Sequence, residues 1–451
     1  MKKEMPRDLA LSVLNRLPDR ATPSGTHLEE ALHSRSDFDE RDRAFIGHLV
    51  QGVLRWRLRL DWDIGRVSSL PVAKIDPPVL NILRLALYQI SFMDRVPESA
   101  AVDQAVNQAK SRGRHIGSFV NGVLRNLCRW KQEISLPDKT ADLVLYLSIR
   151  HSYPEWLVRK WVAERGPEFT EELLSAGNRV PGLTLRVNSL KTDRSTLIDR
   201  LTEEGVAAKP TSYSPSGVLV EGFRGRINRL RSYREGLFQV QDEAAQVPSW
   251  LLDPKPGDRV LDVCAGLGGK TTHLAERSED RARIVSLDIR FRRLLSLARN
   301  SLRLGLANVS PVAANAAAGL SGVFRCEFDR ILVDAPCSGL GVVSRHPDIK
   351  WNRKEEDLPR LASMQRAILT ESVSLLRRGG KMLYVTCTLS REENEGVVRS
   401  FLGDRREMVL ENLKDSAPGW AVDLIDTQGF YRTFPHVHHM DGFFGAMFVK
   451  N

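Results

Sequence analysis

The chain has 451 residues, more than one hydrophobic core usually serves, so two or three domains are expected. Apolar residues make up 42% and charged residues 27% of the sequence, which is the composition of an ordinary globular protein and argues against intrinsic disorder. The 66 basic and 56 acidic residues leave a formal net charge of +10, which fits a polyanionic partner and, equally well, a basic surface kept for solubility.

Neither a secretion signal nor a membrane span is expected. Met1 to Glu4 turn charged at once, and no run of about 18 apolar residues follows anywhere. The five cysteines are an odd number without a CxxC pair, so we expect neither a disulfide framework nor a structural zinc site. These features predict a cytoplasmic protein with free thiols, and we expect a monomer.

Residues 1–140 carry the apolar spacing of helices throughout. Phe45 to Val53 form one apolar stripe, and Val79 to Ile90 form a segment that is apolar on nearly every side. This pattern predicts an all-helical domain. Two basic clusters on its polar faces, Arg55–Arg59 and Lys110–Arg114, are candidates for binding phosphates.

The sequence changes in character over residues 145–238. Leu183–Asn188 alternates like a strand, helical spacing follows at Leu197–Leu201, and Gly217–Val220 is strand-like again, which predicts a small α+β domain. Five arginines within it form a second candidate surface for nucleic acid, although a solvated loop would look the same. They are Arg224, Arg226, Arg229, Arg231 and Arg234.

Over residues 239–451 short apolar strands alternate with helices. Strands are predicted at Arg259–Val263, Ile284–Asp288, Arg330–Asp334 and Met382–Thr386, and helices at Leu294–Leu304 and Leu361–Leu376. The alternation predicts a doubly wound, mostly parallel α/β sheet of the Rossmann-like kind, with ligands at the carboxyl ends of its strands.

A glycine-rich loop follows the first of these strands and opens a helix. Its residues are Cys264, Ala265, Gly266, Leu267, Gly268, Gly269 and Lys270. Glycines let the backbone turn tightly and lie against a ligand, but the spacing is neither the dinucleotide fingerprint nor a P-loop. Asp288 ends the next strand, where a carboxylate can accept hydrogen bonds from ribose, although such a residue is as often a helix cap. Loop and Asp288 together favour an adenosine-type cofactor without separating a nicotinamide from S-adenosylmethionine.

Two cysteines follow the last two predicted strands. Cys337 lies three residues after Asp334, and Cys387 directly follows Thr386. Because neighbouring parallel strands end at the same edge of a sheet, both thiols are expected to face one crevice. A lone buried cysteine is usually a small hydrophobic residue, and the other three are interpreted in that way. They are Cys128, Cys264 and Cys326.

These motifs carry a resemblance to a known family. Asp334–Ala–Pro–Cys337–Ser–Gly339 and Thr386–Cys387 resemble the two signature motifs of the RNA 5-methylcytosine methyltransferases. Further matching segments are Arg345–Trp351, Gln239–Gln246, Pro435–His438 and Asp441–Phe444. Phe119–Arg125 is similar to the RNA-binding domain of the antitermination factor NusB. Over essentially its whole length the chain resembles the bacterial 16S ribosomal RNA (cytosine-5) methyltransferases of the RsmB (Sun) type.

The resemblance implies a class I methyltransferase that uses S-adenosylmethionine and acts on 16S ribosomal RNA. It implies that Cys387 is the nucleophile and that Cys337 assists product release. Asp334 is expected to hydrogen-bond the ring nitrogen or exocyclic amine of the base and is also a candidate cofactor-binding residue, although such a residue can simply cap the end of a strand. The residues alone do not say which cysteine has which part.

The resemblance also implies the cofactor site. The backbone of Cys264–Lys270 is expected against the methionine portion, Asp288 on the ribose and Asn315 at the adenine amine. The chain departs from the family twice, since Gly266–Leu267 stands where Ala–Pro is usual and Asn315 where Asp is usual. The second departure removes a charge from the acceptor, which bears on cofactor affinity.

Other interpretations remain open at this point. The same chemistry could act on another RNA such as transfer RNA, or the chain could be a non-catalytic RNA-binding or assembly factor with a vestigial methyltransferase domain. A DNA cytosine methyltransferase is disfavoured because it would not need Thr386–Cys387. His436, His438 and His439 form the one metal-like cluster, and we interpret it as a structural or RNA-facing turn, because no further ligand set accompanies it.

Overall fold

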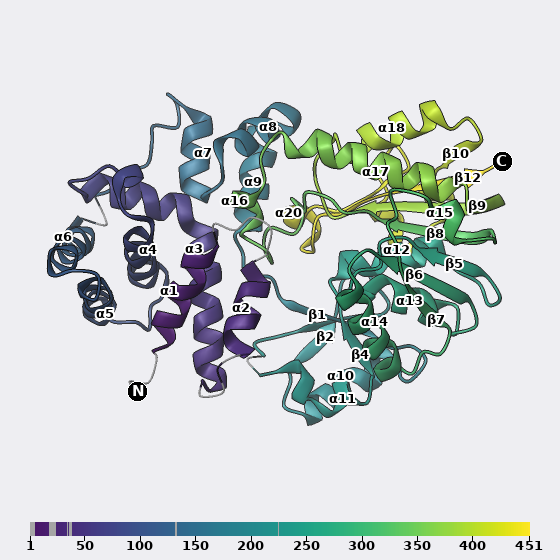
Figure 1. The fold of residues 1–451 in the computed structure, drawn as a ribbon, viewed down its shortest axis with the longest axis horizontal. Helices are drawn as coiled ribbons and strands as arrows, with labels where there is room; N and C mark the ends of the chain where they lie inside the picture. The colour runs from purple at the N-terminus through teal and green to yellow at the C-terminus, as the bar shows by residue number, and fades with distance from the viewer. Residues whose placement is uncertain (1–4, 18–23, 34, 36–37, 131–132, 224) are drawn as a thin grey trace. The chain divides into compact units, whose positions relative to one another are not determined.

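The computed structural model describes residues 5–17, 24–33, 35, 38–130, 133–223 and 225–451. Met1 to Glu4 and Arg224, which the sequence analysis used, lie outside these ranges. The chain forms two compact units, Met1–Arg179 with Val343–Arg353, and Val180–Val342 with Lys354–Asn451 (Figure 1). Within the described ranges, no helix has the length and apolar character needed to cross a membrane.

The first unit is helical, as predicted. Its longest helix, α3 (Glu40–Val67), begins where the side chain of Asp39 accepts a hydrogen bond from the backbone of Asp42, and the stripe Ile46–Val53 supplies core residues. α4 (Pro77–Phe92) begins with two prolines and is buried over most of its length. The other elements are α1 (Pro6–Arg16), α2 (Ser24–His33), η1 (Val72–Lys74), α5 (Glu98–Lys110), α6 (Arg114–Trp130), α7 (Leu143–His151), α8 (Glu155–Arg165), α9 (Pro167–Gly177) and α16 (Ile349–Asn352).

Residues 343–353 belong to this helical unit although they come late in the chain. Lys350 is fully buried, and its ammonium donates to the carbonyl oxygens of Arg55 and Ser152, each at 3.1 Å, and to Asn178 Oδ1 at 2.7 Å. The indole of Trp351 donates to the carbonyl of Leu54 at 2.6 Å. Burial, reinforced by the charge of Arg55, lowers the pKa of Lys350 well below its usual value.

These contacts correct the interpretation of Arg55–Arg59 as a phosphate-binding cluster. Arg55 is only 4% exposed and donates to the carbonyl of Ser344 at 2.7 Å. Arg57 lies over the ring of Trp351, and Arg59 is paired with Asp63 at 3.0 Å. These three arginines therefore do not form a phosphate-binding surface, because their guanidinium groups contact other residues of the helical unit. Lys110, Arg112 and Arg114 of the second cluster are exposed.

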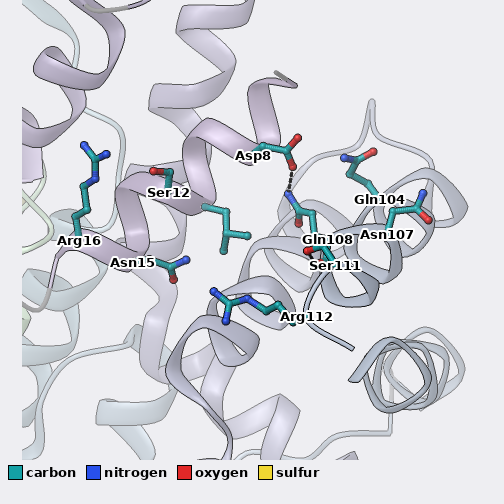
Figure 2. A pocket seen from close by; sticks show the side chains of 10 residues that line it. Asp8, Ser12, Asn15, Arg16, Gln104, Asn107, Gln108, Ser111 and Arg112 are labelled. Atoms are coloured by element: carbon teal, nitrogen blue, oxygen red, sulfur yellow. Dashed lines mark hydrogen bonds between the residues drawn. The ribbon is translucent and has the colours of Figure 1, made fainter. Parts of the chain in front are cut away.

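A polar cavity of about 640 Å³ opens in the helical unit beside that second cluster. Figure 2 shows Ser12, Asn15 and Arg16 of α1 on one side and side chains of α5 on the other, with Arg112 following α5. Gln108 Nε2 donates to Asp8 Oδ1 at 2.8 Å and joins the two helices. Two basic side chains, one carboxylate and four amides therefore line the cavity.

The second unit begins with a small antiparallel sheet of strand order β2-β3-β1-β4. Its elements are β1 (Leu183–Val187), α10 (Arg194–Glu203), β2 (Ala208–Pro210), β3 (Gly217–Val220), η2 (Ile227–Arg229), α11 (Arg231–Arg234) and β4 (Phe238–Val240). Leu185, Val187, Val218 and Phe238 from the strands pack with Leu197 and Leu201 of α10. The predicted α+β character is present.

A larger sheet follows, with strand order β10-β12-β9-β8-β5-β6-β7 and β11 paired to β12 (Figure 1). β5 (Arg259–Asp262), β6 (Arg283–Asp288), β7 (Val309–Ala313), β8 (Phe328–Asp334) and β9 (Leu376–Thr386) are parallel, and β10 (Met408–Glu411), β11 (Tyr431–Arg432) and β12 (Phe444–Lys450) form antiparallel pairs. The other elements are α12 (Glu243–Leu252), α13 (Gly269–Arg277), α14 (Phe291–Leu304), α15 (Leu320–Val323), α17 (Asp357–Val373), α18 (Glu395–Asp404), α19 (Leu413–Ser416), η3 (Gly419–Leu424) and α20 (Pro435–His438).

Alternate residues of the central strands fill two cores, one on each face of the large sheet. Ile331 and Val333 of β8 pack with α17 and α18, whereas Leu332 between them packs with α12 and α13. Burial on both faces explains why these strands read as continuous apolar runs. The predicted Rossmann-like sheet is confirmed.

Two details differ from the sequence prediction. The helix predicted to end at Leu376 ends at Val373, and Leu376 already begins β9, because its apolar side chain suits either spacing. β7 and the antiparallel strands β10 to β12 were not predicted. β7 has no residue that is fully buried, so it lacks the apolar run by which the central strands were found.

A buried ion pair fastens the small sheet to the large one. Arg186 of β1 is fully buried and donates to both carboxylate oxygens of Glu276 on α13, at 3.1 and 2.7 Å. The same guanidinium donates to the carbonyl of Gly269 at 2.6 Å. Arg186 thereby connects the small sheet to the loop and helix that follow β5.

We expect Arg186→Met to lower the free energy of unfolding by about 3–5 kcal/mol, because the carboxylate of Glu276 would stay buried without its cation. The double variant Arg186→Met/Glu276→Met should recover most of this loss, because it removes both charges. Urea unfolding of the two variants measures the effect. Equal losses in the single and the double variant would show that packing, rather than charge, makes the connection.

Candidate active site

The glycine-rich loop after β5 has the backbone that the sequence predicts. Gly266 and Gly268 have φ angles of 57° and 85°, in the left-handed region. A Cβ at Gly268 would lie 2.5 Å from Leu297 Cγ, whereas a Cβ at Gly266 would meet nothing within 4 Å. Gly268 is therefore required for packing, and Gly266 faces open space.

Asp288 joins this loop to the end of β6. Its Oδ2 accepts from the backbone N–H of Gly266 at 3.0 Å, and its Oδ1 accepts from that of Arg290 at 2.7 Å. The bond to Arg290 orients the backbone before α14, so Asp288 also fills part of the capping role that the sequence analysis gave as its alternative. Because a carboxylate can accept about four hydrogen bonds, Asp288 retains capacity for ribose hydroxyls.

Asn315 lies two residues beyond β7, whose last residue, Ala313, pairs with Asp288 in the sheet. Its side chain is exposed, and its Oδ1 accepts from the backbone N–H of Ala317 at 3.0 Å. Asn315 is thus at the same sheet edge as Asp288.

The two predicted cysteines lie side by side. β8 and β9 are adjacent parallel strands, and the Sγ atoms of Cys337 and Cys387 are 3.3 Å apart. The backbone N–H of Gly341 donates to the carbonyl of Cys387 at 2.9 Å, which holds the two loops together beyond the strands. The hydrogen bond with Cys387, together with burial, raises the pKa of Cys337 well above its usual value.

Lys270 and Asp334 form an ion pair beside the thiols. Lys270 Nζ donates to Asp334 Oδ2 at 2.7 Å and lies 5.0 Å from the ring centre of Phe443. Burial lowers the pKa of Lys270, but the charges of Asp334 and Cys387 outweigh it, so the net shift is upward. The backbone of Lys270 is in the glycine-rich loop, while its ammonium reaches Asp334 at the sheet edge that carries the cysteines.

Asp262, at the end of β5, is a third carboxylate in this region. It is 1% exposed, and its Oδ2 accepts from Thr271 Oγ1 at 2.6 Å. Burial, together with the charge of Asp334, raises the pKa of Asp262 to about 7. Burial also raises the pKa of the neighbouring Cys264 well above its usual value. Cys264 therefore remains a thiol that packs against the core, as interpreted from the sequence.

Sequence reasoning missed a buried polar network under the two cysteine loops. Ser338 Oγ and Thr388 Oγ1, each one residue after a cysteine, are 2.6 Å apart. Glu393 is fully buried, and its Oε2 accepts from the backbone N–H of Ser338 at 2.8 Å and from Gln365 Nε2 at 2.9 Å. A glutamine on the apolar face of α17 was the available signal, because a buried amide needs partners.

The remaining candidates lie elsewhere. Cys326 is exposed in the segment between α15 and β8, so its interpretation as a buried hydrophobic residue is wrong. Cys128 is partly buried against the helical core. His438 Nδ1 accepts from the backbone N–H of Phe434 at 3.0 Å and shapes the turn around α20. In the described part of the chain, no three His, Cys, Asp or Glu side chains are grouped as metal ligands.

The fold and the site define a class. A mostly parallel sheet carries a glycine-rich loop after β5, an acidic residue at the end of β6 and two adjoining thiols after β8 and β9. This is a Rossmann-like methyltransferase domain with a cysteine pair at its ligand-binding edge.

Comparison with known proteins identifies the family. Residues 249–449 match the family described as 16S rRNA methyltransferase RsmB/F, residues 4–129 the NusB family, and residues 153–225 the ferredoxin-like domain of RsmF/B-like methyltransferases. The chain is similar to the probable ribosomal RNA small subunit methyltransferase B of Bacillus subtilis (strain 168), with 34% identity over 445 residues that cover 98% of each chain. The chain belongs to the RsmB/F methyltransferase family.

Solved structures agree with this assignment. The crystal structure of PH0851 superposes with a TM-score of 0.82 at 26% identity and covers 99% of both chains. The structure of NSun6 from Pyrococcus horikoshii with SFG has a TM-score of 0.59 at 26% identity and covers 66% of this chain and 99% of that one. The predicted family, its three kinds of domain and its class of enzyme are thereby confirmed.

The raised pKa of Asp262 predicts a pH dependence of stability. Because its pKa is about 7 in the folded chain and 3.8 as a free group, the folded state binds more protons between these values, and stability falls as pH rises through them. We expect the stability of Asp262→Asn relative to the parent to rise with pH, by at most about 1.4 kcal/mol per unit. Urea unfolding between about pH 5 and about pH 8 measures it. The exposed Asp404→Asn is the control, and a pH-independent difference for Asp262→Asn would refute the prediction.

Proposed function

We propose that the chain transfers a methyl group from S-adenosylmethionine to carbon-5 of a cytosine in 16S ribosomal RNA, through a covalent adduct between Cys387 and carbon-6 of the base. The observation that supports this most strongly is the 3.3 Å separation of Cys337 Sγ and Cys387 Sγ at the ligand-binding edge of the sheet. The substrate follows from the relatives, whose names specify the ribosomal RNA of the small subunit.

The residues present fit the cofactor. The left-handed backbone at Gly266 leaves open space beside the start of α13, where free N–H groups and the helix dipole suit a carboxylate. Asp288 offers acceptors for the ribose, and Asn315 offers an acceptor for the adenine amine. When bound, S-adenosylmethionine supplies an electrophilic methyl group. NSun6, a similar protein, was solved with SFG in place.

Cys387 makes carbon-5 reactive. Carbon-5 of cytosine is a poor nucleophile until a thiolate adds to carbon-6, which forms the S–C6 bond and breaks the C5–C6 double bond. Carbon-5 would then take the methyl group as the bond from that group to the cofactor sulfur breaks, and S-adenosylhomocysteine would leave. The proton of carbon-5 passes to a base and finally to solvent, the C5–C6 double bond returns, and the S–C6 bond breaks to release Cys387 as a thiolate. Cys337, in contact with that sulfur, assists the release.

Asp334 and Lys270 serve the base itself. The carboxylate of Asp334, held by Lys270 at 2.7 Å, hydrogen-bonds the exocyclic amine or ring nitrogen as charge develops on the ring. The ammonium of Lys270 also lies in the field of Cys387, where a cation favours the thiolate. Of the residues expected to bind cofactor, we therefore assign the side chain of Lys270 to the substrate.

RNA binding falls to basic side chains outside this site. In the helical unit, Lys110, Arg112 and Arg114 are exposed and are suited to phosphates, and Arg112 also lines the cavity of Figure 2. In the small domain, Arg231 is exposed and pairs with Glu235. Phosphate contacts of this kind give affinity that falls steeply with salt.

Two alternatives remain to be separated by experiment. The same chemistry on transfer RNA would leave 16S RNA unmodified, and bisulfite sequencing of both RNAs from cells lacking the gene distinguishes the two. A vestigial domain would bind RNA without the cofactor. The intact cysteine pair and its ion pair favour an enzyme.

The two cysteines should give different trapped species. Cys387→Ala should lose methylation and form no covalent complex, because no S–C6 bond can form. Cys337→Ala should accumulate a protein–RNA complex that survives denaturing electrophoresis, because addition proceeds and release stalls. A complex with Cys387→Ala instead would reverse the assignment. Methylation retained by both variants would refute the adduct mechanism.

Asn315→Asp should tighten S-adenosylmethionine binding by about three- to tenfold, because a charged acceptor makes a stronger hydrogen bond to the adenine amine. Asn315→Ala should weaken it. Calorimetric titration of the cofactor measures both. Dissociation constants that are unchanged in the two variants would remove Asn315 from the site.

A further inference from the structure

The structure leaves open why one cysteine of a touching pair should ionise rather than the other. Both thiols follow parallel strands, and their sulfur atoms are 3.3 Å apart. The second pair, Ser338 Oγ and Thr388 Oγ1 at 2.6 Å, repeats the contact one residue later on each loop. The two loops therefore look alike in their own contacts, and the difference must come from what packs beneath them.

Glu393 packs beneath them asymmetrically. Its Oε2 receives the backbone N–H of Ser338, the residue after Cys337, at 2.8 Å, while its Oε1 is 3.4 Å from Thr388 Oγ1, after Cys387. Gln365 Nε2 donates both to Glu393 Oε2 and to the carbonyl of Pro336, the residue before Cys337, each at 2.9 Å. The carboxylate is thus fastened to the main chain on both sides of Cys337.

Other charged and titratable groups also lie near the pair. The charge of Lys270 of α13 interacts with Cys387, and its ammonium is bonded to Asp334 of β8. Tyr384 of β9 donates to the carbonyl of Glu393 at 2.6 Å. The raised pKa of Cys337 has the hydrogen bond with Cys387 as its largest cause, followed by burial and the charges of Cys387 and Glu393.

We infer that Glu393 is a positioning residue that keeps the proton of the cysteine pair on Cys337, so that Cys387 is the sulfur that ionises and Cys337 donates its S–H to it. A negative charge fastened beneath Cys337 disfavours a second negative charge there, whereas Lys270 favours one on Cys387. On release, the S–H of Cys337 hydrogen-bonds the departing sulfur. The role of Glu393 in catalysis rests on the proposed function, whereas its effect on the two thiols can be tested without it.

The test is the pH dependence of alkylation of the two thiols by iodoacetamide, in the full chain without RNA or cofactor. Only a thiolate displaces iodide, so peptide mass spectrometry at low extents of modification gives a separate titration for Cys337 and Cys387. In the parent protein, Cys387 should react at lower pH than Cys337. The reverse order would overturn the inference.

Glu393→Gln should lower the midpoint of Cys337 and reduce the preference for Cys387 about tenfold, which corresponds to about one pK unit. Glu392→Gln is the matched control, because Glu392 is the adjacent carboxylate and is bonded to Ser390 Oγ at 2.8 Å. An unchanged preference in a Glu393→Gln protein with a native melting temperature would overturn the inference.

Glu393→Asp keeps the charge and shortens the reach, so it separates charge from geometry. We expect Glu393→Asp to retain the preference for alkylation at Cys387. This variant provides the test if Glu393→Gln does not fold. Loss of the preference in a folded Glu393→Asp protein would contradict the assignment to charge. Because none of these readouts involves methylation, failure of the adduct mechanism would show instead as missing trapped complexes with normal thiol titrations.

Discussion

The parallel pairing of β8 with β9 is the constraint on which the site depends. The register that places Asp334 opposite Val385 brings the two following loops out of the sheet at the same height. Backbone bonds continue this pairing beyond the strands, from Ala335 to Val385 and from Gly341 to Cys387. The distance between the thiols is therefore fixed by main chain, which is stiffer than any side-chain contact.

The same strand order separates the two halves of the candidate site. β5 lies between β8 and β6, so the glycine-rich loop and Asp288 are on one side and the cysteines on the other. Lys270 belongs to both, because its backbone is in the loop and its ammonium reaches Asp334. In the proposed function, the adjacency of β5 and β8 would give a short path between methyl donor and base.

Sequence patterns found most of the strands that are buried on both faces. β5, β6 and β8 were predicted to within two residues, β9 was predicted only from Met382 although it begins at Leu376, and the cysteine pair followed from the adjacency of the strands. β7, β10 and β11 were missed because partly exposed or very short strands have no distinctive composition. β12, although largely buried, was also missed.

Long-range polar partners account for two further errors. Arg55 was predicted to be a surface charge. Its acceptor, the carbonyl of Ser344, is 289 residues away and could not be recognised from the neighbouring sequence. Glu393 was overlooked for a similar reason, since its partner Ser338 belongs to another loop. No local pattern reports such pairings, because a buried charge and an exposed one have the same sequence neighbours.

The helical unit contains residues from two separate parts of the chain, so it cannot be removed by a simple truncation. This affects how its proposed part in RNA binding can be tested. Residues 343–353 belong to it, yet they connect the loop of Cys337 to α17. Removing the residues before 180 would take away Arg55, Ser152 and Asn178, the partners of Lys350, together with the helices against which residues 343–353 pack. A truncated protein that fails to methylate would therefore report lost packing as well as lost RNA contacts. Exposed positions such as Arg112 and Arg114 avoid the ambiguity, because substituting them changes the charge offered to phosphates and leaves the helical core intact.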